Sequence, residues 1–154
     1  MQCYKNAKPT EQIQVLDRAF HYGDGCFSTA RIRNNQVELW HRHLARLEHA
    51  KQNMHLTANL EFINKTLADL KQKHGKLNGT LKLVLSRGEG QRGYSLPEHP
   101  ADVWVFFYPQ AQETLGAEYH YEIIQSGVLE QTIGLTMPQL VGVKSLNRLE
   151  QVLL

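Results

Sequence analysis

The sequence has no apolar run as long as a membrane-spanning helix requires, which is about 18 residues or more. Its first ten residues are polar and lack the apolar core of a secretory signal. Net charge is also small, at +2 from 17 basic and 15 acidic residues, which argues against a general binder of nucleic acids or membranes. We therefore expect a cytoplasmic protein with neither kind of partner.

Cysteine is scarce too, because the 154 residues include only Cys3 and Cys26. They lie far apart, without the close spacing of a metal or redox pair, so free thiols in a reducing cytosol are expected. Repeats and low-complexity segments are absent, and 42% of the residues are hydrophobic, which excludes general disorder. The length suits one domain, or one domain and part of a second.

The first regular pattern in the sequence is an alternation of side chains that is typical of a strand. Residues 26–33 place Thr29, Arg31 and Arg33 on one face and Ser28, Ala30 and Ile32 on the other. Asn34-Asn35 then predicts a hairpin turn into residues 37–39, because asparagine tolerates a left-handed backbone. Further strands are expected at four places: a short edge strand within 1–14, then 81–86, a central strand at 103–108, and 119–125.

Helical spacing of apolar residues predicts two well-formed helices and a third near the end of the chain. The first well-formed helix, of about four turns, has an apolar stripe of Trp40, Leu44, Leu47 and Met54. The second begins after Asn59 as N-cap, ends at Gly75, and buries Leu60, Ile63, Leu67 and Leu70. Residues 17–25 predict a short helical turn and a loop.

The last predicted helix has Ser145 as its cap and Leu146, Leu149 and Leu153 as its buried stripe. It reaches Leu154 without a capping residue or a polar tail. This pattern predicts that the chain is a truncated part of a longer protein.

Gly88, Gly90 and Gly93 spell G-x-G-x-x-G after a predicted strand, the pattern of a dinucleotide site. Such a site needs a helix that opens at the third glycine. Residues 94–97, Tyr-Ser-Leu-Pro, do not begin one, so the dinucleotide interpretation is disfavoured. Two interpretations stay open: a flexible hairpin loop, and a loop over a substrate in which Arg87, Arg92 and Tyr94 hold a carboxylate.

Two other sets of polar residues are not expected to take part in metal binding or catalysis. His41 and His43 stand two positions apart in a predicted helix and so point to different faces, which argues against a metal site. Asp24, within the sequence YGDG, is expected to organise a turn rather than to catalyse.

Lys144 lies between apolar residues and the last predicted helix, with Arg148 four residues later. On one helix face the two charges would repel each other, so either both extend into solvent or an anionic ligand lies between them. Burial and Arg148 would both lower the pKa of Lys144. A lysine with a lowered pKa is a nucleophile that can form a Schiff base with an aldehyde cofactor.

Four stretches, taken together, resemble the fold-type IV pyridoxal-phosphate (PLP) enzymes, which include branched-chain and D-amino-acid aminotransferases. They are DRAFHYGDGCFSTARI from Asp17, HRHLARL from His41, SRGEGQRGYS from Ser86 and VGVKSLNRLEQV from Val141. The first, third and fourth are similar to the lyase branch of that group. The resemblance implies an α/β (α+β) fold: a small N-terminal α/β domain over 1–111, a linker over 112–116, and the start of a larger PLP-binding domain over 117–154.

The resemblance also implies roles for single residues. Lys144 matches the lysine that forms the Schiff base with PLP, and Arg46 matches an arginine that holds the cofactor phosphate. Arg148 matches a position near the ring oxygen of the cofactor. Thr29 matches a second catalytic residue, which faces the cofactor and takes part in proton transfer to the leaving pyruvate.

The reaction implied is that of an oxo-acid lyase of folate biosynthesis, which converts 4-amino-4-deoxychorismate into 4-aminobenzoate and pyruvate. Arg92 and Tyr94 would hold the carboxylates of this small-molecule substrate, and the enzyme would be a homodimer. Two alternatives stay open. One is a D-amino-acid or branched-chain aminotransferase that shares Lys144 and Arg46, and the other is a non-catalytic fragment or dimerisation module.

Overall fold

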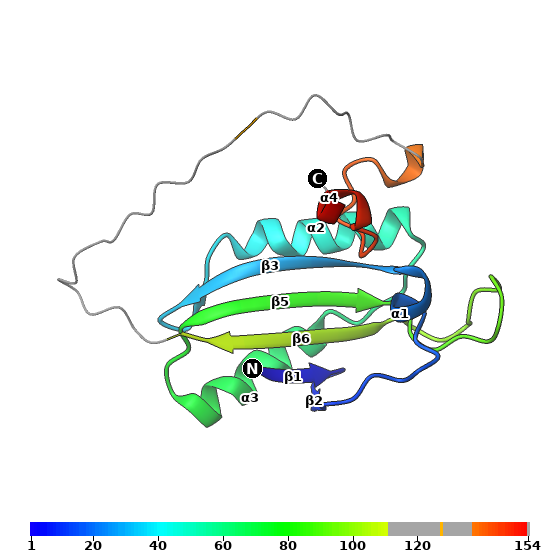
Figure 1. The fold of residues 1–154 in the computed structure, drawn as a ribbon. Helices are drawn as coiled ribbons and strands as arrows, with labels where there is room; N and C mark the ends of the chain where they lie inside the picture. The colour runs from blue at the N-terminus through cyan, green and yellow to red at the C-terminus, as the bar shows by residue number, and fades with distance from the viewer. Residues whose placement is uncertain (111–126, 128–136, 154) are drawn as a thin grey trace.

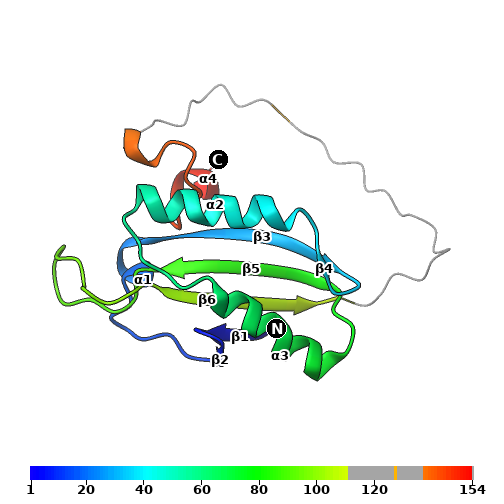
Figure 2. The same cartoon turned by 180° about the vertical axis from the view of Figure 1, so that it is seen from behind.

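The computed structural model describes residues 1–110, 127 and 137–153. Its centre is one antiparallel sheet with the strand order β2-β1-β6-β5-β3-β4, and two helices cover one of its faces (Figures 1 and 2). The strands are β1 Gln2–Lys5, β2 Lys8–Pro9, β3 Gly25–Arg33, β4 Gln36–Val37, β5 Gly79–Ser86 and β6 Asp102–Pro109. The helices are α1 Arg18–Tyr22, α2 Trp40–Asn53, α3 Glu61–His74, the 3-10 turn Pro138–Leu140 and α4 Leu149–Leu153. No described helix is both long enough and apolar enough to cross a membrane.

The two central strands β5 and β6 build much of the core, and they confirm the predicted strands at 81–86 and 103–108. Every second residue of each strand faces α2 and α3, while the residues between them face the opposite side. Leucines from β5 and valines from β6 pack against buried residues of both helices. The fully buried set includes Leu47, Ile63, Leu70, Leu81, Leu83, Leu85, Val103 and Val105.

Strand β3 confirms the alternation that the sequence predicts. Thr29, Arg31 and Arg33 are exposed, whereas the alternate residues of the strand are buried. Asn34 and Asn35 have φ values of 51° and 67°, the left-handed pair that a tight hairpin needs. The returning strand β4 is shorter than predicted, because Leu39 already serves as the cap residue of α2.

Both well-formed helices are confirmed, with their buried residues on the predicted sides. In α2, Leu47 is buried and Trp40 and Met54 pack against the core. In α3 the formal cap is Leu60, but the Asn59 side chain accepts a hydrogen bond of 3.1 Å from the amide of Glu61. Asn59 therefore still satisfies a free amide of the first turn.

At the N-terminus the prediction of one edge strand is incomplete. Strands β1 and β2 form a small hairpin at the sheet edge, with Tyr4 opposite Pro9. The turn between them has positive φ at both Asn6 and Ala7. The residues before the long β3 strand also confirm the predicted helical turn, since Asp17 caps α1 by accepting a hydrogen bond of 2.8 Å from the amide of Ala19.

The prediction for the last helix is wrong in its start and in its buried stripe. Ser145 does not cap a helix but pairs with Cys26 in a β-bridge, and α4 begins only at Leu149. Leu149 and Leu153 are 64% and 76% exposed. The reason is a competing set of hydrogen bonds, because residues 144–146 bind the free edge of β3 in extended form.

Some predictions fall outside the described residues. These are the strand at 119–125 and the linker at 112–116. The division of the chain into a small domain and the start of a larger one stays a prediction.

Candidate active site

The first half of β3 and residues 143–148 meet beside α2, and this junction brings Lys144 into the fold (Figures 1 and 2). The amide of Phe27 donates to the carbonyl of Lys144 at 3.0 Å, and the amide of Leu146 donates to the carbonyl of Gly25 at 2.9 Å. Through these two hydrogen bonds, residues 144–146 lie alongside β3 as a short extended segment of the sheet. The backbone of Lys144 is therefore fixed against a rigid strand rather than carried on a helix.

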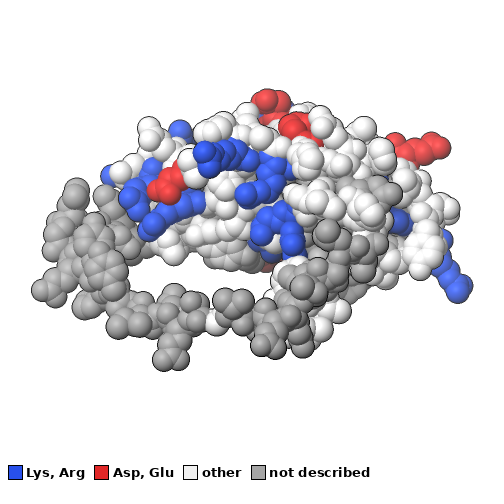
Figure 3. Space-filling view, turned by 90° about the horizontal axis from the view of Figure 1, so that it is seen from above, with Lys and Arg blue, Asp and Glu red and all other residues white. Residues whose placement is uncertain are grey.

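Three positively charged side chains surround the ring of Phe27. The Nζ atom of Lys144 lies 4.5 Å from the ring centroid, and the guanidinium carbon of Arg148 lies 5.8 Å from it. The Nζ atom of Lys82, on the neighbouring strand, is 5.4 Å away. Aromatic faces attract cations, so the ring gathers these groups in one place. Figure 3 shows that Lys and Arg side chains gather on this side of the molecule.

The pKa of Lys144 is lowered below its ordinary value. Burial is the largest cause, followed by the positive charges of Arg148 and Arg46. This direction is the one that the sequence predicts, and Arg46 adds a contribution that the spacing of Lys144 and Arg148 did not suggest. The fold thus brings Lys144, Arg148 and Arg46 together, and it favours the neutral, nucleophilic form of the lysine.

The expected helical arrangement of Lys144 and Arg148 is not found, because α4 begins after both residues. Arg148 turns back along the chain instead. Its Nε donates to the carbonyl of Ser145 at 3.0 Å, and its Nη2 lies 3.5 Å from the carbonyl of Val143. Arg148 therefore ties down the segment that presents Lys144, in addition to placing its charge nearby.

Arg46 extends from α2 to the buried hydroxyl of Ser28 on β3, at 2.9 Å from its Nη1 atom. His43, one helical turn earlier, binds the same hydroxyl through Nδ1 at 2.8 Å. Ser28 is fully buried. Sequence reasoning missed this Ser28–His43–Arg46 group, although the three-residue spacing of His43 and Arg46 places both on one helix face.

Thr29 stands on the same face of β3 as Phe27, two residues further along, and pairs with Lys82 across to β5. It is exposed. Within the described residues, no contact joins Thr29 to Lys144. Its role at the cofactor stays a prediction.

The glycine-containing loop after β5 opens no helix, in agreement with the sequence. Arg87 is buried and held by Asp24, whose Oδ2 accepts from the Nε of Arg87 at 2.8 Å. Arg87 is thereby unsuited to hold a substrate. Arg92 and Tyr94 are exposed on the loop, Tyr94 to 84%, and within the described residues no contact joins them to the cations around Phe27. Their role as substrate ligands stays a prediction.

Asp24 organises more than a turn. The Nε of Arg18 donates to the same Oδ2 atom at 2.8 Å, so two guanidinium groups share one carboxylate oxygen. Arg18 also donates to the loop carbonyls of Gly93 and Ser95, at 3.2 and 3.3 Å. The prediction of a structural role for Asp24 agrees with this arrangement, whereas the two arginine partners have no sequence signal.

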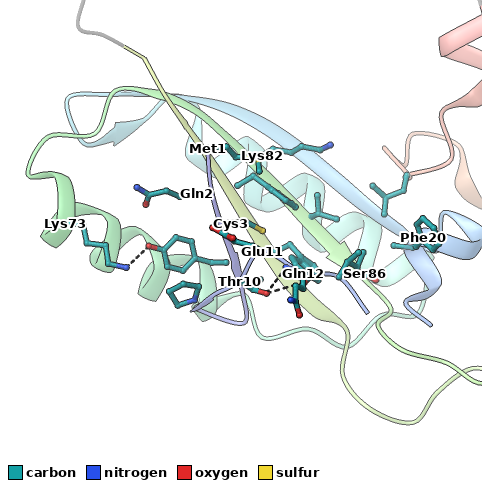
Figure 4. Close-up of a pocket in the computed structure, with 18 residues that line it drawn as sticks. Met1, Gln2, Cys3, Thr10, Glu11, Gln12, Phe20, Lys73, Lys82 and Ser86 are labelled. Atoms are coloured by element: carbon teal, nitrogen blue, oxygen red, sulfur yellow. Dashed lines mark hydrogen bonds between the residues drawn. The ribbon is translucent and has the colours of Figure 1, made fainter. Parts of the chain in front are cut away.

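A groove lies on the sheet face opposite the helices, beside the cations around Phe27. Its volume is about 850 Å³. Figure 4 shows Lys82 and Ser86 of β5, Cys3 of β1 and Phe20 of α1 around it. The floor is apolar, with Val84, Trp104 and Phe106. Lys82 contributes to both places, because it lines the groove while its ammonium lies near Phe27.

Residues 25–154, which include β3 and the whole segment around Lys144, match the amino-transferase class IV family. The chain belongs to this family. A class IV relative, the aminodeoxychorismate lyase of Vibrio harveyi, is 34% identical over 96% of this chain and 54% of its own length. The chain therefore spans about half the length of this curated relative.

Solved structures agree with the class IV assignment. The 4-amino-4-deoxychorismate lyase of Pseudomonas aeruginosa is similar with a TM-score of 0.73 and 29% identity, over 98% of this chain and 54% of that one. A hypothetical aminotransferase of Mycobacterium tuberculosis in a PLP-bound form has a TM-score of 0.56 and 22% identity, over 71% and 39%. The second likeness shows the fold alone. The antiparallel sheet with its two helices is thus the class IV arrangement, as the resemblance implied.

Proposed function

We propose that the protein to which this chain belongs is a PLP-dependent aminodeoxychorismate lyase, which converts 4-amino-4-deoxychorismate into 4-aminobenzoate and pyruvate for folate synthesis in the cytoplasm. The observation that carries the proposal is Lys144, whose pKa is lowered beside Arg148 and Arg46. The identity of 34% to an aminodeoxychorismate lyase supports the choice of reaction within the class IV family.

The side chains around Lys144 fit PLP. Its aldehyde requires a neutral amine, which burial and two nearby guanidinium groups favour at Lys144. Its phosphate requires cationic donors, and Arg46 has a guanidinium that suits a phosphate in charge and geometry. Bound PLP supplies a ring that accepts the electrons of a broken bond. Arg148 would then lie towards the ring oxygen.

The proton transfers and the binding of the substrate would be carried out by residues of this chain. The amine of Lys144 takes the proton from the substrate carbon that bears the amino group, a task suited to a lysine with a lowered pKa. The hydroxyl of Thr29 hands a proton to the departing pyruvate. Arg92 and Tyr94 hold the substrate carboxylates, and two copies of the protein form a homodimer.

The direct test is covalent labelling of the chain. PLP is added, borohydride reduces the product, and mass spectrometry maps the modified residue. We expect label on Lys144 and a loss of that label in Lys144→Ala. Lys82→Ala serves as the matched control, because Lys82 lies near the same ring; it should keep the label. Equal labelling of Lys144→Ala and the unchanged chain would overturn the proposal.

An aminotransferase of the same fold is separated from the lyase by its second substrate. A lyase releases pyruvate from 4-amino-4-deoxychorismate without any amino-group acceptor. An aminotransferase needs a 2-oxo acid and interconverts PLP and pyridoxamine phosphate. Pyruvate release by the whole protein in the absence of a 2-oxo acid therefore supports the lyase, and pyridoxamine phosphate formed from D-alanine or leucine contradicts it.

A further inference from the structure

The Ser28–His43–Arg46 group defined above lies where β3 contacts α2. Ser28 belongs to the helix-facing side of β3 and has no solvent exposure. Its Oγ lies 2.9 Å from Nη1 of Arg46 and 2.8 Å from Nδ1 of His43. A buried hydroxyl thus connects two side chains that stand one turn apart on α2. Arg46 itself is largely exposed, so Ser28 anchors one side of an otherwise free guanidinium.

The direction of each hydrogen bond follows from the chemistry of the three groups. A guanidinium has only donors, so Arg46 donates and the oxygen of Ser28 accepts. The hydroxyl hydrogen of Ser28 then needs an acceptor, and within the described residues its only other partner is Nδ1 of His43. Nδ1 must therefore carry no proton. His43 is neutral in this arrangement, with its hydrogen on Nε2.

The surroundings of His43 agree with a neutral ring. Burial lowers its pKa most, the charge of Arg46 lowers it further, and a hydrogen bond with the Glu38 backbone acts in the opposite direction. A protonated His43 would turn Nδ1 into a second donor towards Ser28. The hydroxyl would then lose its acceptor, and Arg46 would face another positive charge.

Only one of the Arg46 nitrogen atoms is used in this way within the described part of the chain. The remaining N–H groups are available to a ligand. The charge of Arg46 also reaches Lys144, since it contributes to the lowered pKa of that amine. Arg46 therefore lies close enough to Lys144 for its charge to act on that amine.

We propose that Ser28 and His43 are positioning residues, which hold Arg46 in the orientation that binds the phosphate of PLP. The inference rests on the proposed function. Its physical basis is that a long side chain fixed in advance loses less freedom when the ligand binds. In this proposal Ser28 and His43 act on the phosphate through Arg46.

The first experiment compares two aldehydes that differ only in the phosphate. PLP and pyridoxal are titrated separately into the chain, and affinities are read from the absorbance of the adduct. Ser28→Ala should weaken PLP binding about three- to tenfold, the range expected for freeing one long side chain, and leave pyridoxal binding unchanged. Ser28→Thr keeps the hydroxyl and should retain most of the PLP affinity.

Thr66→Val is the matched control. Thr66 is also fully buried, but its hydroxyl binds only the Phe62 carbonyl of its own helix, at 2.8 Å. This variant should leave both affinities unchanged. An equal loss for PLP and pyridoxal in Ser28→Ala would mean general damage to the fold and would overturn the positioning role. An unchanged ratio of the two affinities would overturn it as well.

A second experiment needs no ligand. Long-range ¹H–¹⁵N spectra of the histidine rings report which nitrogen carries the proton. We expect His43 in the Nε2–H form, with a change at Nδ1 in Ser28→Ala. A proton on Nδ1 in the unchanged chain would contradict the inference. Absence of any label on Lys144 with either aldehyde would instead contradict the proposed function, so the two failures are distinguishable.

Discussion

At the scale of single residues, the chemistry centres on the amine of Lys144. Burial and two guanidinium groups all disfavour its charged form. The ring of Phe27, 4.5 Å from Nζ, gives the charged form some support while holding the side chain in place. The lowered pKa is therefore a property of the junction between β3 and residues 143–148, not of the lysine's immediate sequence neighbours alone.

The first prediction concerns the pH dependence of this amine. Arg148→Gln removes one positive charge, so the pKa of Lys144 should rise towards the ordinary lysine value of 10.5. Less neutral amine is then present at pH 7 to 8, and labelling by pyridoxal should slow at that pH. The measurement is the rate of borohydride-trapped labelling against pH, whose midpoint should move upward.

Arg31→Gln is the control for this experiment. Arg31 is exposed on the same face of β3 as Phe27 but does not contribute to the lowered pKa of Lys144. Its removal should leave the midpoint in place. If Arg148→Gln and Arg31→Gln gave the same midpoint, the influence assigned to Arg148 would be wrong.

At the scale of elements, Asp24 connects three parts of the fold. Its carboxylate binds Arg18 of α1 and Arg87, the residue after β5. Arg87 also donates to the carbonyls of Met54 and His55, just beyond α2, at 2.7 and 3.2 Å. One small acidic residue thus compensates two buried positive charges and fixes the base of the glycine-containing loop.

The second prediction follows from these charges. Asp24→Asn should lower the free energy of unfolding by about 3 kcal/mol, because it leaves two buried guanidinium groups without their counter-charge. Urea unfolding followed by tryptophan fluorescence measures the loss. Glu38→Gln is the control, because it removes only the exposed ion pair with Arg33, at 3.7 Å. It should change the free energy of unfolding by no more than about 0.5 kcal/mol. Similar losses in both variants would contradict the assignment.

The third prediction concerns the place where residues 144–146 join β3. A Cβ atom on Gly25 would collide with the carbonyl of Leu85 and lie 2.7 Å from Cδ1 of Leu146. Gly25→Ala should therefore displace the segment that presents Lys144 and reduce its labelling by PLP. Hydrogen exchange at the amides of Phe27 and Leu146 should increase at the same time.

Gly75→Ala provides the comparison. Gly75 has φ of +69°, so alanine is strained there too, but no atom lies within 4 Å of the added Cβ. The strain should lower stability while the label on Lys144 is kept. Undiminished labelling of Gly25→Ala would show that the close packing at Gly25 does not hold Lys144 in place.

Elements with a regular pattern are the ones that the sequence predicts well. The alternation of β3 and the stripes of α2 and α3 each correspond to one buried face. The start of the last helix fails because Ser145 is a good cap locally but its backbone meets the free edge of β3. The reactivity of Lys144 is predicted from its sequence surroundings and the role of Arg46 from resemblance, whereas the Ser28–His43 contact joins distant segments and has no sequence signal.

At the scale of the whole molecule, the sheet has two unlike faces. One is covered by α2 and α3, and the other carries the groove with its apolar floor (Figure 4). Ile13 and Phe20 line this groove and are 51% and 70% exposed. Exposed apolar side chains beside an apolar groove are a feature of surfaces that bind another protein.

The last prediction is that the chain forms a homodimer through this face. We expect sedimentation at micromolar concentration to give about twice the mass of 17.7 kDa. Phe20→Glu should shift the protein towards monomer, because it places a charge at the edge of the groove, while costing little stability in an exposed position. Leu96→Glu, in an exposed loop outside the groove, should leave the mass unchanged. A monomeric unchanged chain would contradict the prediction, and an equal shift in both variants would place the contact elsewhere.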